Sequence, residues 1–198
     1  MIEQLNNGSQ LDKYLDIDSI LRYFAANSFL VNFDSYAGSL KHNYYLYEEN
    51  GVCTILPWDF NLAFAGHEIS SAQKAVNFPI DTPVTVNLSE RPLMGKLLEI
   101  PEYKELYHKY LQQLTKDYIN SGRFEDSVEK LDKLINSSVK NDATAFYSYA
   151  EYEKSLPVLV EFARLRGQSI QAQLSGEQAA TATGQNENST PNIDASGI

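Results

Sequence analysis

The sequence is poor in the residues that build covalent cross-links, cationic patches and membrane spans. Of its 198 residues only Cys53 is a cysteine, which excludes an intrachain disulfide and a multi-cysteine metal site. Lys and Arg number 16 against 26 acidic residues, and no basic cluster occurs, so neither nucleic acid nor an anionic membrane is an expected partner. The richest apolar stretch, 20–33, is interrupted by Arg22 and two asparagines, so no membrane span is expected. The first residues also lack the charged and apolar segments of a signal peptide.

Signatures of several familiar active sites are also missing. The sequence contains no phosphate-binding glycine loop, no dinucleotide fingerprint, no zinc-protease His-Glu-x-x-His and no serine nucleophile elbow. The histidines His42, His67 and His108 are too scattered in the sequence to suggest a zinc site. Asp16 and Asp18 lack the later ligands of a calcium loop and are better explained as the start of a helix.

What the sequence does contain is enough apolar bulk for a core and several clear local signals. Hydrophobic residues make up 43% of the chain, which favours one globular domain or part of a larger one. Apolar residues recur near the helical period over 18–32, where Asp18 is a plausible N-cap. Two strand-like runs, 43–48 and 52–56, flank Asn50-Gly51, which predicts a tight hairpin.

The second half of the chain is predicted to be helical. Residues 61–90 show no sustained period, and a loop of that length is rare unless it is functional or mobile. Ser148 begins a capping-box pattern for the last helix. The polar end, 177–198, has almost no apolar bulk and is expected to be disordered. Helical patterns cover four stretches: 91–100, 101–118, 128–139 and 148–174.

Acidic residues and an amide stand at the joints of the predicted hairpin. Asp34 follows the first helix, Asn43 begins the hairpin, and Asp59 comes directly after it. The catalytic lobe of a protein kinase has the same order of parts, with a proton-accepting aspartate followed by metal-binding amide and carboxylate groups. The pattern differs in the residues around these positions, because Ser39 stands five residues after the first aspartate and Asn61 replaces the usual glycine. The residues alone also leave open ordinary turn-capping roles and an acid–base pair of a glycoside hydrolase.

Longer motifs resemble one family. The segments that carry the resemblance are Asn32-Phe-Asp-Ser-Tyr-Ala-Gly38, His42-Asn-Tyr-Tyr-Leu-Tyr47, Pro57-Trp-Asp-Phe-Asn-Leu-Ala-Phe64, Arg91-Pro-Leu93, the Pro101-Glu-Tyr103 segment, and Phe162 to Leu174. Over roughly residues 10–176 the chain resembles the spore coat protein H (CotH) kinase family. The resemblance implies an atypical protein-kinase-like fold that transfers phosphate from ATP to protein, notably to coat proteins of bacterial spores. It also implies a location in the spore coat or, as a secreted protein, at the cell surface.

The resemblance assigns roles to individual residues. It implies that Asp34 is the catalytic aspartate, that Asp59 binds Mg²⁺ or Mn²⁺, and that Asn43 is a candidate ligand of the metal or a phosphate. His42 and Asn61 belong to the family pattern without a derived role. The resemblance also suggests that Arg91 could contact substrate or a structural carboxylate.

The resemblance also predicts how the chain is divided. We expect a mainly α chain with a short β-hairpin (α+β), forming the C-lobe of an atypical kinase-like fold over 16–176. Residues 1–15 are then the junction to a missing N-lobe, and 177–198 is the polar tail. Because no strand-borne lysine or phosphate-covering loop is found, we expect the isolated chain to have very weak kinase activity.

The principal alternative is a non-catalytic, pseudokinase-like interaction module of the spore coat or cell surface. In either interpretation the expected partner is a protein, as phosphate acceptor or as binding partner. The sequence leaves the identity of the acceptor, the oligomeric state and the compartment open.

Overall fold

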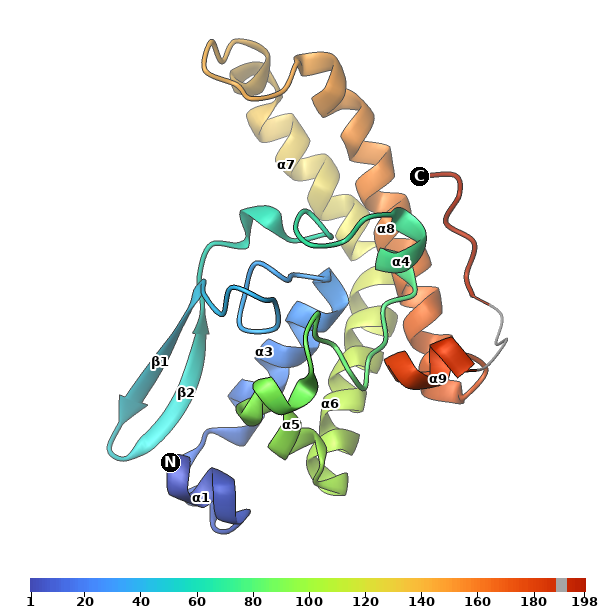
Figure 1. The fold of residues 1–198 in the computed structure, drawn as a ribbon. Helices are drawn as coiled ribbons and strands as arrows, with labels where there is room; N and C mark the ends of the chain where they lie inside the picture. The colour runs from blue at the N-terminus through green and yellow to red at the C-terminus, as the bar shows by residue number, and fades with distance from the viewer. Residues whose placement is uncertain (188–191) are drawn as a thin grey trace.

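The computed structural model describes residues 1–187 and 192–198, and within them the chain is mainly helical with one two-stranded sheet (Figure 1). The helices are α1 (Ile2–Asn7), α2 (Leu11–Tyr14), α3 (Ile17–Leu30), α4 (Ala72–Val76), α5 (Pro92–Leu98), α6 (Pro101–Gln113), α7 (Arg123–Lys140), α8 (Tyr149–Ser175) and α9 (Ala182–Glu187). The strands are β1 (Tyr44–Glu49) and β2 (Val52–Pro57), and three short turns of helix are η1 (Phe60–Leu62), η2 (Leu88–Glu90) and the π-helical η3 (Leu114–Ile119). The expected α+β class with a short hairpin is confirmed.

Helix α3 is the centre of the core and contacts α6, α8 and β2. Its buried side chains include Leu21 and Phe24, both fully shielded from solvent. The helix begins one residue earlier than expected, because the N-cap is Asp16, whose carboxylate accepts a hydrogen bond from the Ser19 amide at 3.1 Å. Asp18 lies in the first turn instead, where its carboxylate binds Arg22 at 2.7 Å.

The hairpin forms as the sequence predicts. Asn50 and Gly51 both have positive φ angles, 53° and 83°, as a type I′ turn requires. The strands pair in antiparallel register from Tyr44 opposite Pro57 to Glu49 opposite Val52. On the inner side of β2, Cys53 is buried and its carbonyl accepts a hydrogen bond from the Asp16 amide at 2.9 Å, which fastens the hairpin to the start of α3.

The last two long helices, α7 and α8, lie side by side, and α7 with the first half of α8 projects from the body as an arm, while the second half of α8 is buried in the body (Figure 1). The predicted capping box at the start of α8 is confirmed, with Ser148 and Glu151 satisfying each other's backbone amides. Helix α8 continues through Pro157 to Ser175, so the proline does not end it.

Two regions contain more regular structure than the sequence predicts. The long stretch 61–90 holds the five-residue helix α4, which is too short to produce a periodic pattern. The polar end was expected to be disordered, yet residues 182–187 form α9, and Gln178 is buried against the body. Side-chain amides make many of these contacts, together with apolar residues such as the buried Ala195, as described below.

Candidate functional site

The carboxylate of Asp34 is held in the loop after α3, where only 6% of the residue is exposed. Asn43 donates a hydrogen bond from Nδ2 to Oδ2 of Asp34 at 2.9 Å. Nε2 of His42 contacts the other carboxylate oxygen, Oδ1. Because each oxygen has its own partner, the carboxylate is fixed in orientation, as a group that accepts a proton from a positioned hydroxyl must be.

The backbone of this loop is compact because its side chains bond to it. The hydroxyl of Ser35 donates to the Asn32 carbonyl at 2.6 Å and accepts from the Ala37 amide at 3.2 Å. A Cβ atom at Gly38 would lie only 1.6 Å from the Phe33 carbonyl oxygen, so no other residue fits there without moving the backbone. The turn that carries Asp34 therefore depends on a glycine four residues later.

Arg91 holds the Asp34 loop through hydrogen bonds to backbone carbonyl oxygens. Its guanidinium is fully buried and donates to the carbonyl of Tyr36 at 2.6 Å, to that of Glu90 at 2.9 Å, and to that of Gly38. The expectation that Arg91 contacts substrate or a carboxylate is therefore wrong. Its position just before α5 makes it a brace between that helix and the Asp34 loop.

Glu68 fastens the far end of the loop to the segment that follows the hairpin. Its carboxylate accepts hydrogen bonds from the Ser39 amide at 3.1 Å, from the Ser39 hydroxyl and from the Thr85 hydroxyl. Burial disfavours the charged carboxylate, but these hydrogen bonds outweigh burial and hold the pKa of Glu68 below its ordinary value. Hydrogen bonds thus join residues 39, 68 and 85, and no sequence motif predicts this link.

We expect Glu68→Gln to destabilise the chain by about 1–2 kcal/mol near neutral pH, because the amide replaces charge-assisted hydrogen bonds. A carboxyl whose pKa is lowered by folding stabilises the protein above its ordinary value of 4.5 and loses that contribution as pH falls through the folded-state value. The difference in the free energy of unfolding between wild type and Glu68→Gln should therefore become smaller as the pH drops below 4.5. Urea denaturation at several pH values measures this difference. Glu102→Gln, at an exposed glutamate, is the matched control, and a difference that stays constant with pH would contradict the prediction.

The hairpin delivers Asn43 and Asp59 to one end of the sheet. Asn43 adopts a left-handed backbone with φ 53°, and its carbonyl accepts a hydrogen bond from the Trp58 amide at 3.2 Å. Asp59 follows immediately, is exposed, and is also left-handed with φ 50°. Asparagine and aspartate adopt the left-handed region more readily than other non-glycine residues, so the residue types suit the backbone at both positions.

The oxygen atoms at this end of the hairpin suit a hard divalent cation that shares its ligands with phosphate groups. The amide nitrogen of Asn43 is engaged by Asp34, and its oxygen has no protein partner within the described ranges. Asp59 is likewise without a hydrogen-bond partner among the residues described. No group of three or more His, Cys, Asp or Glu side chains in these ranges could hold a metal alone. Two protein oxygens completed by phosphates and water are the usual arrangement for Mg²⁺.

The structure brings together three of the residues singled out from the sequence, Asp34, His42 and Asn43. Asp59 follows Trp58, whose backbone amide bonds to the Asn43 carbonyl, but its side chain makes no hydrogen bond to these three described residues. Asn61 lies in η1 and makes no side-chain hydrogen bond to another described residue. The chemical roles given to these residues stay predictions.

Comparison with known proteins gives two matches. A family model described as CotH kinase protein matches residues 1–170. The chain is also 23% identical over 169 residues to the inner spore coat protein H of Bacillus subtilis (strain 168). That match covers 84% of this chain but 44% of the relative, so the chain spans less than half the length of that protein. Within the described ranges, no helix is both long and apolar enough to cross a membrane.

Proposed function

Since this chain belongs to the CotH kinase protein family, we propose that it takes part in transfer of phosphate from ATP to a protein, as the C-lobe of an atypical protein-kinase-like fold. The relative's name places that protein in the inner spore coat. We propose the same location for this chain and a coat or surface protein as its phosphate acceptor.

The observation that carries the proposal is the fixed carboxylate of Asp34. Asn43 and His42 hold its two oxygens, so the group is oriented before a substrate arrives. In phosphoryl transfer, a carboxylate in this position accepts the proton of the attacking hydroxyl. The carbonyl of the same asparagine accepts from the Trp58 amide, so Asp59 follows directly after the residue that closes the base of the hairpin.

Asp59 and the amide oxygen of Asn43 are the residues proposed to hold Mg²⁺ or Mn²⁺. When bound, the cation supplies the positive charge that neutralises the phosphates of ATP. Two protein ligands alone bind Mg²⁺ weakly, because this ion normally takes its remaining ligands from substrate phosphates and water. We therefore propose that nucleotide and metal bind together.

The residues that would clamp the nucleotide are not found in the described part of the chain. Its one sheet is the β1–β2 hairpin, and neither strand contains a lysine. A kinase orients ATP with a strand-borne lysine and a loop that covers the phosphates. The proposal therefore assigns those groups to a separate nucleotide-binding lobe.

We expect the 198-residue chain alone to transfer phosphate at least ~100-fold more slowly than a protein that joins the same residues to a nucleotide-binding lobe, because positioning supplies much of the rate enhancement. Incorporation of labelled phosphate from ATP with Mg²⁺ or Mn²⁺, at equal protein concentrations, measures the difference. Asp59→Ala in each protein defines the background. Robust labelling by the isolated chain that disappears with Asp59→Ala would overturn the expectation.

A non-catalytic interaction module is the second candidate, and the exposed side of the hairpin favours it. Tyr45, Tyr47, Leu56 and Trp58 are each 41% or more exposed, and Tyr45 and Trp58 pack edge to face. Contiguous exposed apolar groups mark interaction surfaces. Partner binding that is unchanged by substitution of Asp34 and Asp59, in a protein without phosphate transfer, would favour this candidate.

A further inference from the structure

Residues 192–198 run along α4, and one side-chain amide pairs with the backbone of Ile193 in both directions. Asn77, the C-cap of α4, donates from Nδ2 to the Ile193 carbonyl at 2.8 Å. Its Oδ1 accepts from the Ile193 amide at 2.9 Å. The amide group of Asn77 thus satisfies both backbone groups of one residue, as a neighbouring strand would.

A second amide, four residues earlier, extends this pairing along the segment. Gln73 donates from Nε2 to the Ile193 carbonyl at 2.8 Å, and its Oε1 accepts from the Ala195 amide at 2.9 Å. A spacing of four residues places Gln73 and Asn77 on one face at the end of α4. All four hydrogen bonds go to backbone atoms, so the pair recognises a peptide backbone without regard to side chains.

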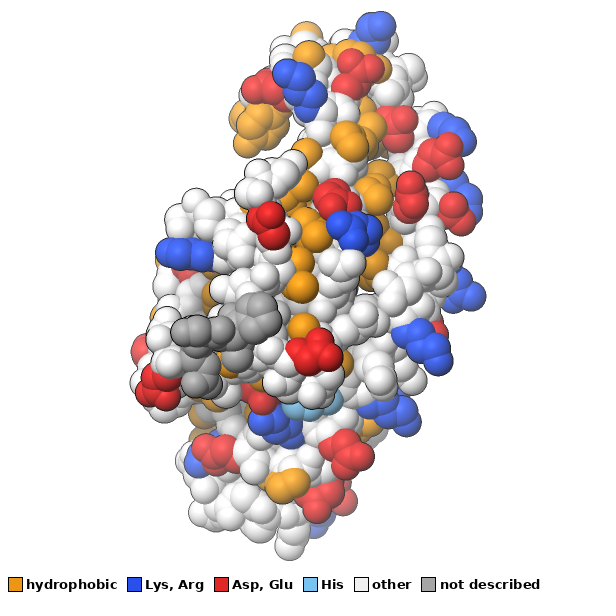
Figure 2. Space-filling view, turned by 90° about the vertical axis from the view of Figure 1, so that its right-hand side faces the viewer, with side chains coloured by type: hydrophobic (Ala, Val, Ile, Leu, Met, Phe, Trp, Pro, Cys, Tyr) orange, Lys and Arg blue, Asp and Glu red, His pale blue; other side chains and the backbone are white. Residues whose placement is uncertain are grey.

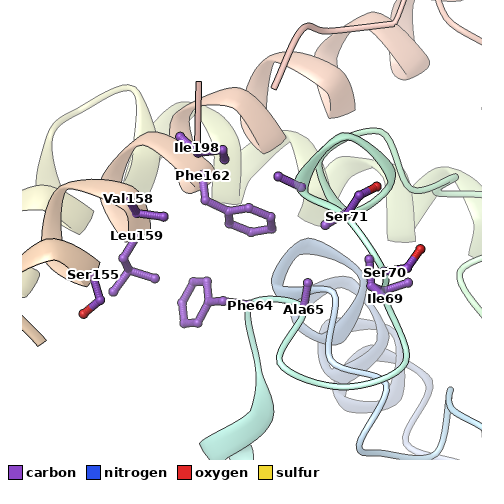
Figure 3. A pocket seen from close by; sticks show the side chains of 12 residues that line it. Phe64, Ala65, Ile69, Ser70, Ser71, Ser155, Val158, Leu159, Phe162 and Ile198 are labelled. Carbon is purple, nitrogen blue, oxygen red and sulfur yellow. The ribbon is translucent and has the colours of Figure 1, made fainter. Parts of the chain in front are cut away.

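The selectivity comes from the spaces beside this amide pair. Ala195 is only 2% exposed, so its position admits a small side chain. The segment ends at Ile198, which lies against Phe162 at an apolar pocket of about 420 Å³ (Figure 3). Phe64, Ile69 and Leu159 line the same pocket, which lies between the segment before α4 and helix α8. Figure 2 shows hydrophobic side chains gathered in a band on this face, between charged groups.

The amide pair keeps part of its hydrogen bonding without any covering peptide backbone. Asn77 is 4% exposed with residues 192–198 in place; its Oδ1 also accepts from Gln178 Nε2 at 3.0 Å, and its Nδ2 also donates to the Gln73 carbonyl at 2.9 Å. The orientation of the Asn77 amide is therefore fixed by bonds other than those to the segment. An amide pair that is oriented in advance, beside an apolar pocket, suits the backbone of a peptide segment.

We propose that Gln73, Asn77 and the pocket between α4 and α8 form a binding site for a peptide segment that is held by its backbone, has a small residue at the place of Ala195 and turns to place an apolar residue at the position of Ile198. Residues 192–198 occupy this site in cis and compete with a peptide of that kind from a partner protein. The inference goes beyond phosphate transfer and does not depend on it.

The first test follows the amide protons of the intact chain by NMR. We expect the Ile193 and Ala195 amides to exchange at least ~10-fold more slowly than that of Gly197, after correction for intrinsic rates. Gln73→Ala with Asn77→Ala should remove this protection, whereas Lys74→Ala, at an exposed residue of the same helix, should keep it. Unprotected Ile193 and Ala195 in the wild-type chain would overturn the proposal.

The second test displaces residues 192–198 from the site and then adds a peptide that can bind there. Ala195→Arg in the full chain places a long charged side chain where almost no space is open, which should displace the cis segment. A synthetic peptide of residues 192–198 should then shift the Gln73 and Asn77 side-chain amide signals saturably, at least ~10-fold more tightly than in wild type. The same peptide carrying Ala195→Arg is the matched control. Absence of any shift in the displaced, folded variant would refute the peptide site.

Discussion

Asp34→Asn and Asp59→Ala should each lower phosphate transfer to a protein acceptor at least ~100-fold in a protein that carries these residues together with a nucleotide-binding lobe. Asparagine has nearly the shape of aspartate but cannot take the proton of an attacking hydroxyl. The two hydrogen-bonding neighbours, His42 and Asn43, remain in place to hold the amide. The loss from Asp34→Asn therefore reports chemistry and not the geometry of the loop.

Asp59→Ala tests the other end of the hairpin. Asp59 is exposed and makes no side-chain hydrogen bond to another described residue, so its replacement should lower the free energy of unfolding by only about 1 kcal/mol, the cost of alanine at a left-handed position, while transfer is lost. The Mg²⁺ dependence of the remaining transfer is a second measurement, because loss of a metal ligand should raise the Mg²⁺ concentration needed for half-maximal transfer.

Labelled phosphate from ATP, counted on the acceptor at several Mg²⁺ concentrations, measures both effects. Asp12→Asn, at an exposed aspartate remote in sequence from the hairpin, is the control and should behave as wild type. Equal labelling in wild type and in both site variants would sink the phosphotransferase proposal and leave the interaction module.

Arg91→Leu should lower the free energy of unfolding by about 3–5 kcal/mol, the largest stability effect we expect in the chain. Leucine removes three hydrogen-bond donors and leaves the buried carbonyls of Tyr36 and Gly38 unpaired. Those carbonyls belong to the loop that carries Asp34, so the loss should reach the candidate site as well as the core.

Chemical denaturation compares this variant with Arg164→Leu. Arg164 pairs with Glu161 at 2.6 Å on the exposed side of α8, where such a pair is worth about 0–1 kcal/mol. If Arg91→Leu does not fold, Arg91→Lys should show a smaller loss in the free energy of unfolding, because the lysine ammonium can bond to some of the three carbonyls. A loss for Arg91→Leu no larger than that for Arg164→Leu would contradict the role of Arg91 as a brace.

The candidate site was largely predictable from local signals. Asn50-Gly51 requires positive φ angles that suit a hairpin turn, and this alone places Asn43 opposite the end of β2. Asp59 then follows from chain order. The grouping of Asp34, His42 and Asn43 was also open to local prediction, because these residues lie within nine residues of one another along the chain.

The braces around the site were not predictable, since they join residues that are distant in sequence. Arg91 reaches the Gly38 carbonyl across 53 residues, and Glu68 reaches Ser39 across 29. Their targets include backbone carbonyls and small hydroxyls, which carry no periodic pattern and no motif. An arginine that binds three carbonyls looks in the sequence like any other arginine.

The end of the chain shows a different limit of sequence reasoning. Rules for disorder weigh apolar bulk and charge, and 177–198 has little apolar bulk. Many of the contacts that its described residues make are between side-chain amides and the backbone, such as that of Gln185 Nε2 with the Asn77 carbonyl at 2.8 Å. An amide can satisfy a buried carbonyl as well as a strand does, but composition does not show which carbonyl it will find.

The rate at which a thiol reagent modifies Cys53 measures how often the molecule opens locally. Cys53 is 6% exposed at the seam between β2 and the start of α3, and burial together with the Glu48 carboxylate raises the pKa of its thiol. The thiolate is the nucleophile that reacts with thiol reagents, so burial and the raised pKa both slow modification of the closed molecule. The rate at which such a reagent modifies the chain therefore counts how often this seam opens. Modification of Cys53 therefore measures detachment from α3 of the hairpin that carries Asn43 and Asp59, and the measurement needs no substrate, nucleotide or partner.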